Sequence, residues 1–329
     1  MTKPGVFEAL EGNWTSLGMP IPKSVKSAGA IARLVGADFK VEKRPCYYKA
    51  KNGKLIEATN RNVIVRADND HMLSIASVNR YNLDFCQPKD LISAIDEELR
   101  AERLEPSHIA VFHNGADIVI SCVLPDEYDI HLAKKDTIKR YLSLIKGYNG
   151  RALSCLIGDV RIFCQNTIQW ATAEAKRGGT IKSIKASTLM TADSIKTMME
   201  QVRILAAPKG EEYKLMAKTK MSDTDVDQFF SNVLKLEHKK LDLVSTKMKT
   251  ILEKLSNAYE SAPGADVGRG TVWGALNAVT YYATHQKSVR DTGREGANQA
   301  RLASNLYGDA ANLKLRALEL AQQFVGVAA

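Results

Sequence analysis

Lysine and arginine residues gather in one quarter of this 329-residue sequence, where they could bind the phosphates of a nucleic acid. The segment from Lys134 to Lys220 has 17 Lys/Arg and 7 Asp/Glu, a net charge of +10, whereas the whole chain carries +9. The preceding stretch, Asp84 to His131, has 3 Lys/Arg and 11 Asp/Glu, a net charge of −8. Charge segregated in this way indicates a polyanionic partner, of which nucleic acid is the commonest. The alternative is a solvated basic surface without a partner.

Aromatic residues lie between these cations, an arrangement typical of single-strand binding, in which cations contact phosphates and rings stack on bases. Tyr148, beside a predicted turn, is the ring that we expect to be exposed, whereas Tyr141, Phe163 and Trp170 are expected in the core. The predicted nucleic-acid-binding residues are Lys134, Lys135, Lys139, Arg140, Lys146, Tyr148, Arg151, Arg161, Lys176, Arg177, Lys182 and Lys185.

Motifs for catalysis and metal binding are weak. The six histidines form no i, i+4 pair and no HExxH motif. The stretch Asp223–Asp227 resembles the start of a calcium loop but lacks the required glycine, so we expect acidic residues at a helix N-terminus. Gly264–Thr271 lacks the spacing of a phosphate-binding P-loop, and Cys164 has no base nearby in the sequence. We therefore predict no catalytic residue, no metal and no cofactor.

The composition is that of a soluble globular protein, with 45% hydrophobic and 25% charged residues. No apolar run is long enough to span a membrane, and the N-terminus lacks the apolar core of a signal peptide. The five cysteines form no CxxC pair, which favours free thiols and a cytoplasmic protein.

The first half of the sequence predicts strands joined by tight turns. Its Asn-Gly pairs suit type I′ hairpin turns, because both residues tolerate a positive φ. The spacing of apolar residues in the stretch Ile138–Ile145 fits a helix as well as a strand. Its position directly before Asn149-Gly150 favours a strand. We expect helices from Ser24 to Gly36 and from Pro88 to about Leu104. The predicted turns are Asn52-Gly53, Asp68–Asp70, Asn114-Gly115 and Asn149-Gly150.

The second half of the sequence changes to helical periodicity near residue 190. Trp273 lies among small residues and is expected to pack against a neighbouring helix. The sequence thus predicts an α+β fold, with a hairpin-rich antiparallel sheet domain over residues 1–190. A mostly helical region over residues 191–329 would pack on that domain or join protomers. The expected helices are Asp193–Ala206, Asp223–Leu236, Leu241–Tyr259, Trp273–Thr284 and Ala310–Phe324.

Four stretches together resemble a family of phage/plasmid-like proteins, grouped as a domain of unknown function and found on phages, plasmids and integrated elements. The resemblance implies a mobile-element origin and a cytoplasmic protein, but no activity. Relatives commonly have His-Asp-Gly where this sequence has Tyr148-Asn149-Gly150. The matching stretches, in family order, are Val41–Tyr48, Val65–Asp68, Val160–Thr167 and Thr271–Thr280.

The leading hypothesis is a phage-type protein that binds nucleic acid, with single-stranded DNA favoured, for recombination, annealing or replication. Phage annealing proteins are similar in outline, being basic, hairpin-rich and often oligomeric, although this is an analogy at the level of fold. Two other hypotheses stay open. One is an interaction protein that antagonises a host factor, and the other is a nuclease or hydrolase with dispersed site residues.

Overall fold

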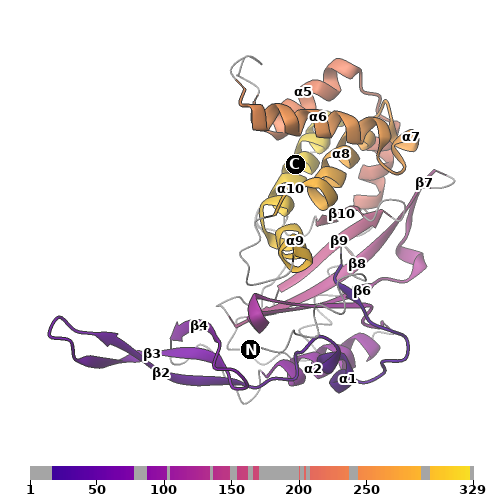
Figure 1. Cartoon of the computed structure of the whole chain (residues 1–329). Coiled ribbons are helices and arrows are strands. Elements are labelled where there is room, and N and C mark those ends of the chain that lie inside the picture. Colours follow the sequence, from indigo (N-terminus) through magenta and orange to yellow (C-terminus); the bar gives the residue numbers. More distant parts are fainter. Residues whose placement is uncertain are drawn as a thin grey trace.

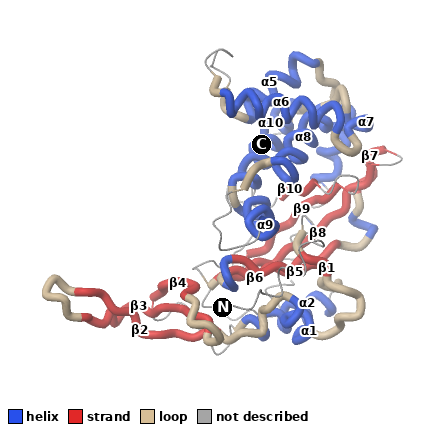
Figure 2. The backbone as a smooth tube through the Cα atoms, viewed as in Figure 1, coloured by secondary structure: helices blue, strands red, loops and turns tan. Residues whose placement is uncertain are grey.

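The fold is α+β, as the sequence predicts, with two antiparallel sheets and a C-terminal group of helices (Figures 1 and 2). The computed structural model describes residues 17–77, 87–101, 104–133, 136–148, 154–161, 166–169, 200, 204, 208–236, 244–289 and 297–326. The expected boundary near residue 190 therefore lies outside the described residues.

The larger sheet is antiparallel throughout and carries most of the buried strands. The ambiguous stretch Ile138–Ile145 lies within strand β8, so the strand prediction is confirmed. In chain order the strands are β1 (Met19–Pro20), β5 (His108–Phe112), β6 (Asp117–Val123), β7 (Ile130–Ala133), β8 (Asp136–Gly147), β9 (Ser154–Arg161) and β10 (Asn166–Gln169). The neighbours run β1-β5-β6-β8-β9-β10, and β7 pairs with β8.

Both faces of the larger sheet are covered. Alternate residues of a strand point to opposite faces, and the two faces belong to different clusters of buried side chains. Ile109 and Ile118 share a cluster with Ile92 of α2 (Pro88–Ala101). Phe112 packs instead with Leu302 of α9 (Ala297–Tyr307). Because the sheet is covered on both faces, β8 is buried at every position from Arg140 to Gly147, although it contains charged residues.

The predicted turns are present where the structure describes them. Asn114 and Gly115 have φ of 54° and 104° in the β5–β6 hairpin, with positive φ at both residues as predicted. In the Asn52-Gly53 turn only Gly53 has a positive φ, of 83°, so the type I′ assignment is wrong there. Asn149-Gly150 lies outside the described residues, although the flanking strands β8 and β9 pair antiparallel.

The smaller sheet consists of β2 (Val41–Lys49), β3 (Leu55–Arg66) and β4 (Met72–Ser77). Its base is buried by Val41, Ile64 and Leu73, whereas the half nearest the β2–β3 turn is largely exposed. Figure 1 shows this hairpin extending away from the rest of the chain. We call residues 41–66 the β2–β3 arm.

Helix α1 (Ala28–Leu34) is capped by Ser27, whose hydroxyl accepts the amide hydrogen of Ala30. The predicted start at Ser24 is therefore three residues too early. The predicted end is confirmed, because Gly36 has a φ of 63°. Pro88 begins α2, as its fixed φ favours.

The C-terminal helices follow the predicted positions with shifted ends. Ser222 caps α5 and forms a capping box with Asp225, which confirms the expected helix start at Asp223–Asp227. Asp193–Ala206 lies outside the described residues except for 200 and 204. Helix α9 was not predicted from the sequence. The helices are residues 208–218, α5 (Asp223–Val233), α6 (Thr246–Ser261), α7 (Ala265–Gly268), α8 (Val272–Tyr281), α9 and α10 (Asp309–Phe324), with a π-helical turn over Tyr282–Gln286.

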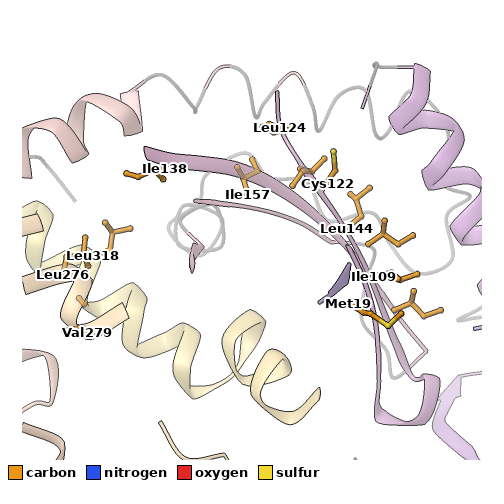
Figure 3. Close-up of a cluster of buried hydrophobic side chains, with 14 of the residues drawn as sticks. Met19, Ile109, Cys122, Leu124, Ile138, Leu144, Ile157, Leu276, Val279 and Leu318 are labelled. Atoms are coloured by element: carbon orange, nitrogen blue, oxygen red, sulfur yellow. The ribbon is translucent and has the colours of Figure 1, made fainter. Parts of the chain in front are cut away.

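Buried apolar side chains fill the space between the sheet and these helices. Figure 3 shows Ile138 and Ile157 on the sheet, and Leu276, Val279 and Leu318 on α8 and α10. All five residues belong to one cluster. Helix α8 is buried along nearly its whole length.

Trp273 of α8 confirms the predicted packing role, since it is only 2% exposed and lies 5.0 Å from the ring of Tyr213, centroid to centroid. We expect Trp273→Ala to lower the free energy of unfolding by about 3–5 kcal/mol, because it removes a buried aromatic side chain. Denaturant unfolding measures the loss. Trp273→Phe, which keeps a ring, should cost clearly less, and equal losses in the two variants would contradict a packing role.

Candidate nucleic-acid interface

Three of the predicted phosphate-binding cations are buried. Arg140, Lys146 and Arg161 are each 3–4% exposed. Arg161 forms two hydrogen bonds to Asp136, of 2.6 and 2.7 Å, and Arg140 donates to Asp159 at 3.3 Å. A guanidinium paired in this way inside the protein is not available to phosphate. The structure therefore corrects the prediction that these three residues form a basic surface.

Tyr148 is also buried, so the prediction of an exposed stacking ring is wrong. Its side chain continues the alternation of β8, which places Leu142 and Leu144 in the same buried cluster. The backbone is fixed as well: the Tyr148 amide donates to the Ala116 carbonyl at 2.6 Å, and the Ser74 hydroxyl donates to the Tyr148 carbonyl. The expectation that Tyr148 would be exposed beside a predicted turn fails, because the alternation of β8 places its side chain in the core.

Lys139 is partly exposed but is bound to carboxylates. Its ammonium lies 2.6 Å from Asp126 and 3.3 Å from Asp129. The hydrogen bond to Asp126 raises the pKa of Lys139. The other predicted residues lie outside the described residues, namely Lys134, Lys135, Arg151, Lys176, Arg177, Lys182 and Lys185.

The buried charges form a cluster between the sheet and the C-terminal helices. Arg161 also donates to the Gly264 carbonyl at 2.9 Å, and the indole of Trp273 donates to Asp136 at 3.1 Å. Burial, followed by the charge of Asp159, raises the pKa of Tyr213 well above its usual value. These groups hydrogen-bond to one another. We therefore interpret the cluster as one that stabilises the packing of the C-terminal helices on the sheet.

The β2–β3 arm combines exposed cations with exposed rings. The described part of residues 134–220 keeps exposed cations such as Lys218 and Lys220, but its rings Tyr141, Tyr148 and Tyr213 are buried. Residues 41–66 contain seven Lys/Arg and two Glu, a net charge of +5. Tyr47 and Tyr48 are 54% and 55% exposed. The sequence analysis missed this site, because it weighed charge over long segments. The signal that could have found it is local, in the form of adjacent tyrosines followed by three lysines within six residues.

The cations of the arm differ in their partners. Arg44 lies 2.7 Å from Asp70 and 3.3 Å from Glu42, and hydrogen bonds to these carboxylates raise its pKa. The outer cations form no ion pair with any residue that the structure describes. Those outer cations are Lys49, Lys51, Lys54 and Arg61, all of them exposed. A phosphate approaching these four cations therefore displaces none of the carboxylates that the structure describes.

The base of the arm is fixed to the larger sheet. Arg66 donates to the Asn114 carbonyl at 3.0 Å and binds Asp68 through two hydrogen bonds of 2.9 and 2.6 Å. Its guanidinium also lies 4.0 Å from the centre of the Phe39 ring. That ring fills the space beside Gly115, where a Cβ would come within 2.5 Å of it. The outer arm is thus presented from an anchored base.

A family model described as Domain of unknown function (DUF932) matches residues 76–306. Because the match covers more than two thirds of the sequence, the chain belongs to this family. No curated protein and no solved structure matches the chain.

Among the residues that the structure describes, no group of three or more His, Cys, Asp or Glu residues could hold a metal ion. None of the helices described has the length and apolar character needed to cross a membrane.

Cys46 and Cys122 are free thiols, and burial raises the pKa of Cys122 to about 12.

The Asp136–Arg161 pair provides a test of the structural interpretation of the buried cations. Asp136→Asn or Arg161→Met alone should lower the free energy of unfolding by about 3–5 kcal/mol, because each leaves a buried charge without its partner. The double variant Asp136→Asn with Arg161→Met should cost less than the sum of the same two single changes, which denaturant unfolding measures. Additive losses would show that the two side chains do not depend on each other.

Proposed function

We propose that this protein binds nucleic acid through the β2–β3 arm, with single-stranded DNA as the favoured ligand. The observation that carries the proposal is one protruding hairpin that presents exposed tyrosine together with four exposed cations, none of which is ion-paired to a residue that the structure describes. Cations that follow a backbone and rings that stack on bases are the two parts of a single-strand site. The net charge of +10 over residues 134–220 supports a polyanionic partner as well.

A two-stranded ribbon can also enter the major groove of a DNA duplex. Single strands are favoured here because the arm carries a tyrosine ring that is more than half exposed, and bases offer their faces to such a ring only when unpaired. In a duplex the ring would meet base edges and sugars.

The biological setting is part of the same proposal. The family resemblance supports a mobile-element origin, and a protein that binds single-stranded DNA there would serve recombination, annealing or replication in the cytoplasm of a bacterial host. Contact with a host protein is the second candidate, because Leu55 and Ile56 are 65% and 39% exposed at the end of the arm. Assembly into a homo-oligomer remains compatible with either function.

The proposal predicts salt-dependent binding that depends on the arm. For single strands the slope of log affinity against log salt is about −0.7 for each phosphate contact. The variant Lys49→Ser, Lys51→Ser and Lys54→Ser should weaken binding and reduce the slope by at least about 1.4, as the contacts of Lys51 and Lys54 are lost. Fluorescence anisotropy with labelled single-stranded DNA at several salt concentrations measures both quantities.

The matched control is Lys247→Ser, Lys249→Ser and Lys254→Ser on α6, where three exposed lysines are likewise without ion pairs among the described residues. The control changes the net charge by the same amount but should leave most of the affinity and the slope. A further variant with Lys176, Arg177, Lys182 and Lys185 replaced by Ser tests the original segment separately. If the arm variant and the α6 variant lost affinity equally, the arm would contribute only general electrostatic attraction and would not be the binding site.

A further inference from the structure

We infer, on the basis of the proposed function, that only one face of the β2–β3 arm is the base-stacking surface, namely the face marked by Tyr48 and Ile56. Successive side chains of a strand point to opposite faces, so Tyr47 and Tyr48 cannot act on the same side of the hairpin. A single strand lying along one face can therefore use only one of the two rings.

The register of the hairpin determines which side chain of β3 lies directly opposite each tyrosine ring. Tyr48 is directly opposite Ile56, whereas Tyr47 is directly opposite Glu57. Directly opposed residues of an antiparallel pair share a face, with their Cβ atoms about 5 Å apart. Tyr48 therefore lies beside an exposed aliphatic side chain, and Tyr47 lies beside an exposed carboxylate.

These neighbours favour the Tyr48 face. The two rings are equally exposed, so exposure does not distinguish them. A nucleic acid stacked on Tyr47 would bring its phosphates close to the like charge of Glu57. On the Tyr48 face the residue directly opposite the ring is Ile56, which extends the apolar surface that a base can cover. Leu55 is also exposed, but it lies on the Tyr47 face and diagonal to that ring, beside Glu57.

The cations are consistent with this assignment. Lys49 is opposite Leu55 and shares the Tyr47 face, where Glu57 offsets its charge. Lys51 lies in the turn at the end of the arm, and Lys54 lies at the entrance to β3, two residues before Ile56. Phosphates that follow bases stacked on Tyr48 can thus reach the cations of the turn.

The test compares two probes that carry the same phosphates, namely an oligothymidine of about 12 nucleotides and a strand of the same length made of abasic sites. Fluorescence anisotropy at low salt gives the dissociation constant of each. The full-length protein should bind oligothymidine about 10-fold more tightly, because only that strand can stack. Tyr48→Ala should reduce this preference to less than about 2-fold, and Tyr48→Trp should restore it.

Tyr47→Ala is the matched control, since it removes an equally exposed ring from the opposite face and should keep the preference. The melting temperature of each variant should stay unchanged, as both rings are exposed. A preference lost in Tyr47→Ala, or lost equally in both alanine variants, would overturn the assignment of the face. Salt-dependent binding without any preference for bases would overturn the inference but leave the proposed function, whereas absence of binding to either strand would overturn both.

Discussion

The buried carboxylate of Asp136 connects the two halves of the chain. It accepts two hydrogen bonds from Arg161 on β9 and one from Trp273 on α8, and Arg161 also reaches the backbone of Gly264 before α7. An unpaired charge in this place would cost several kcal/mol, so the three side chains must stay together. The position of α8 on the sheet follows, and α10 packs on α8 while α9 packs on α10 and β5.

This constraint changes the meaning of the positive charge in the central part of the sequence. Arg140 and Arg161 neutralise buried aspartates, and Lys139 binds Asp126 and Asp129 near the surface. These cations contribute to the net charge of their segment without adding to an accessible basic surface. Among the described residues, the accessible cations without ion pairs that also lie beside exposed rings are those of the outer β2–β3 arm.

Exposed lysines on the arm have a second physical role, since β2 is an edge strand of the smaller sheet. Lysine at a sheet edge discourages pairing with another chain. This role accounts for Lys49, but it does not account for the exposure of Tyr47, Tyr48 and Leu55, which raises the tendency to associate. Cations and exposed rings on the same hairpin are better explained by a ligand with both negative charge and flat apolar surfaces.

Local patterns in the sequence determined the elements whose causes are local. The Asn114-Gly115 turn and the cap at Ser222 are set by neighbouring residues, and each was predictable. The end of α1 at Gly36 was predictable for the same reason. Strand β8 was predictable only from its position before Asn149-Gly150, because its own apolar spacing also fits a helix.

Only the tertiary structure decided which charged and aromatic residues reach solvent. Arg161 and Tyr148 are basic or aromatic like the residues of a binding surface, but Asp136 lies 25 positions from Arg161, and strand pairing brings the two together. Conversely, the β2–β3 arm is exposed because its outer half extends beyond the sheet and helices that could cover it. Burial depends on contacts between residues distant in the sequence, and charge and composition alone do not contain that information.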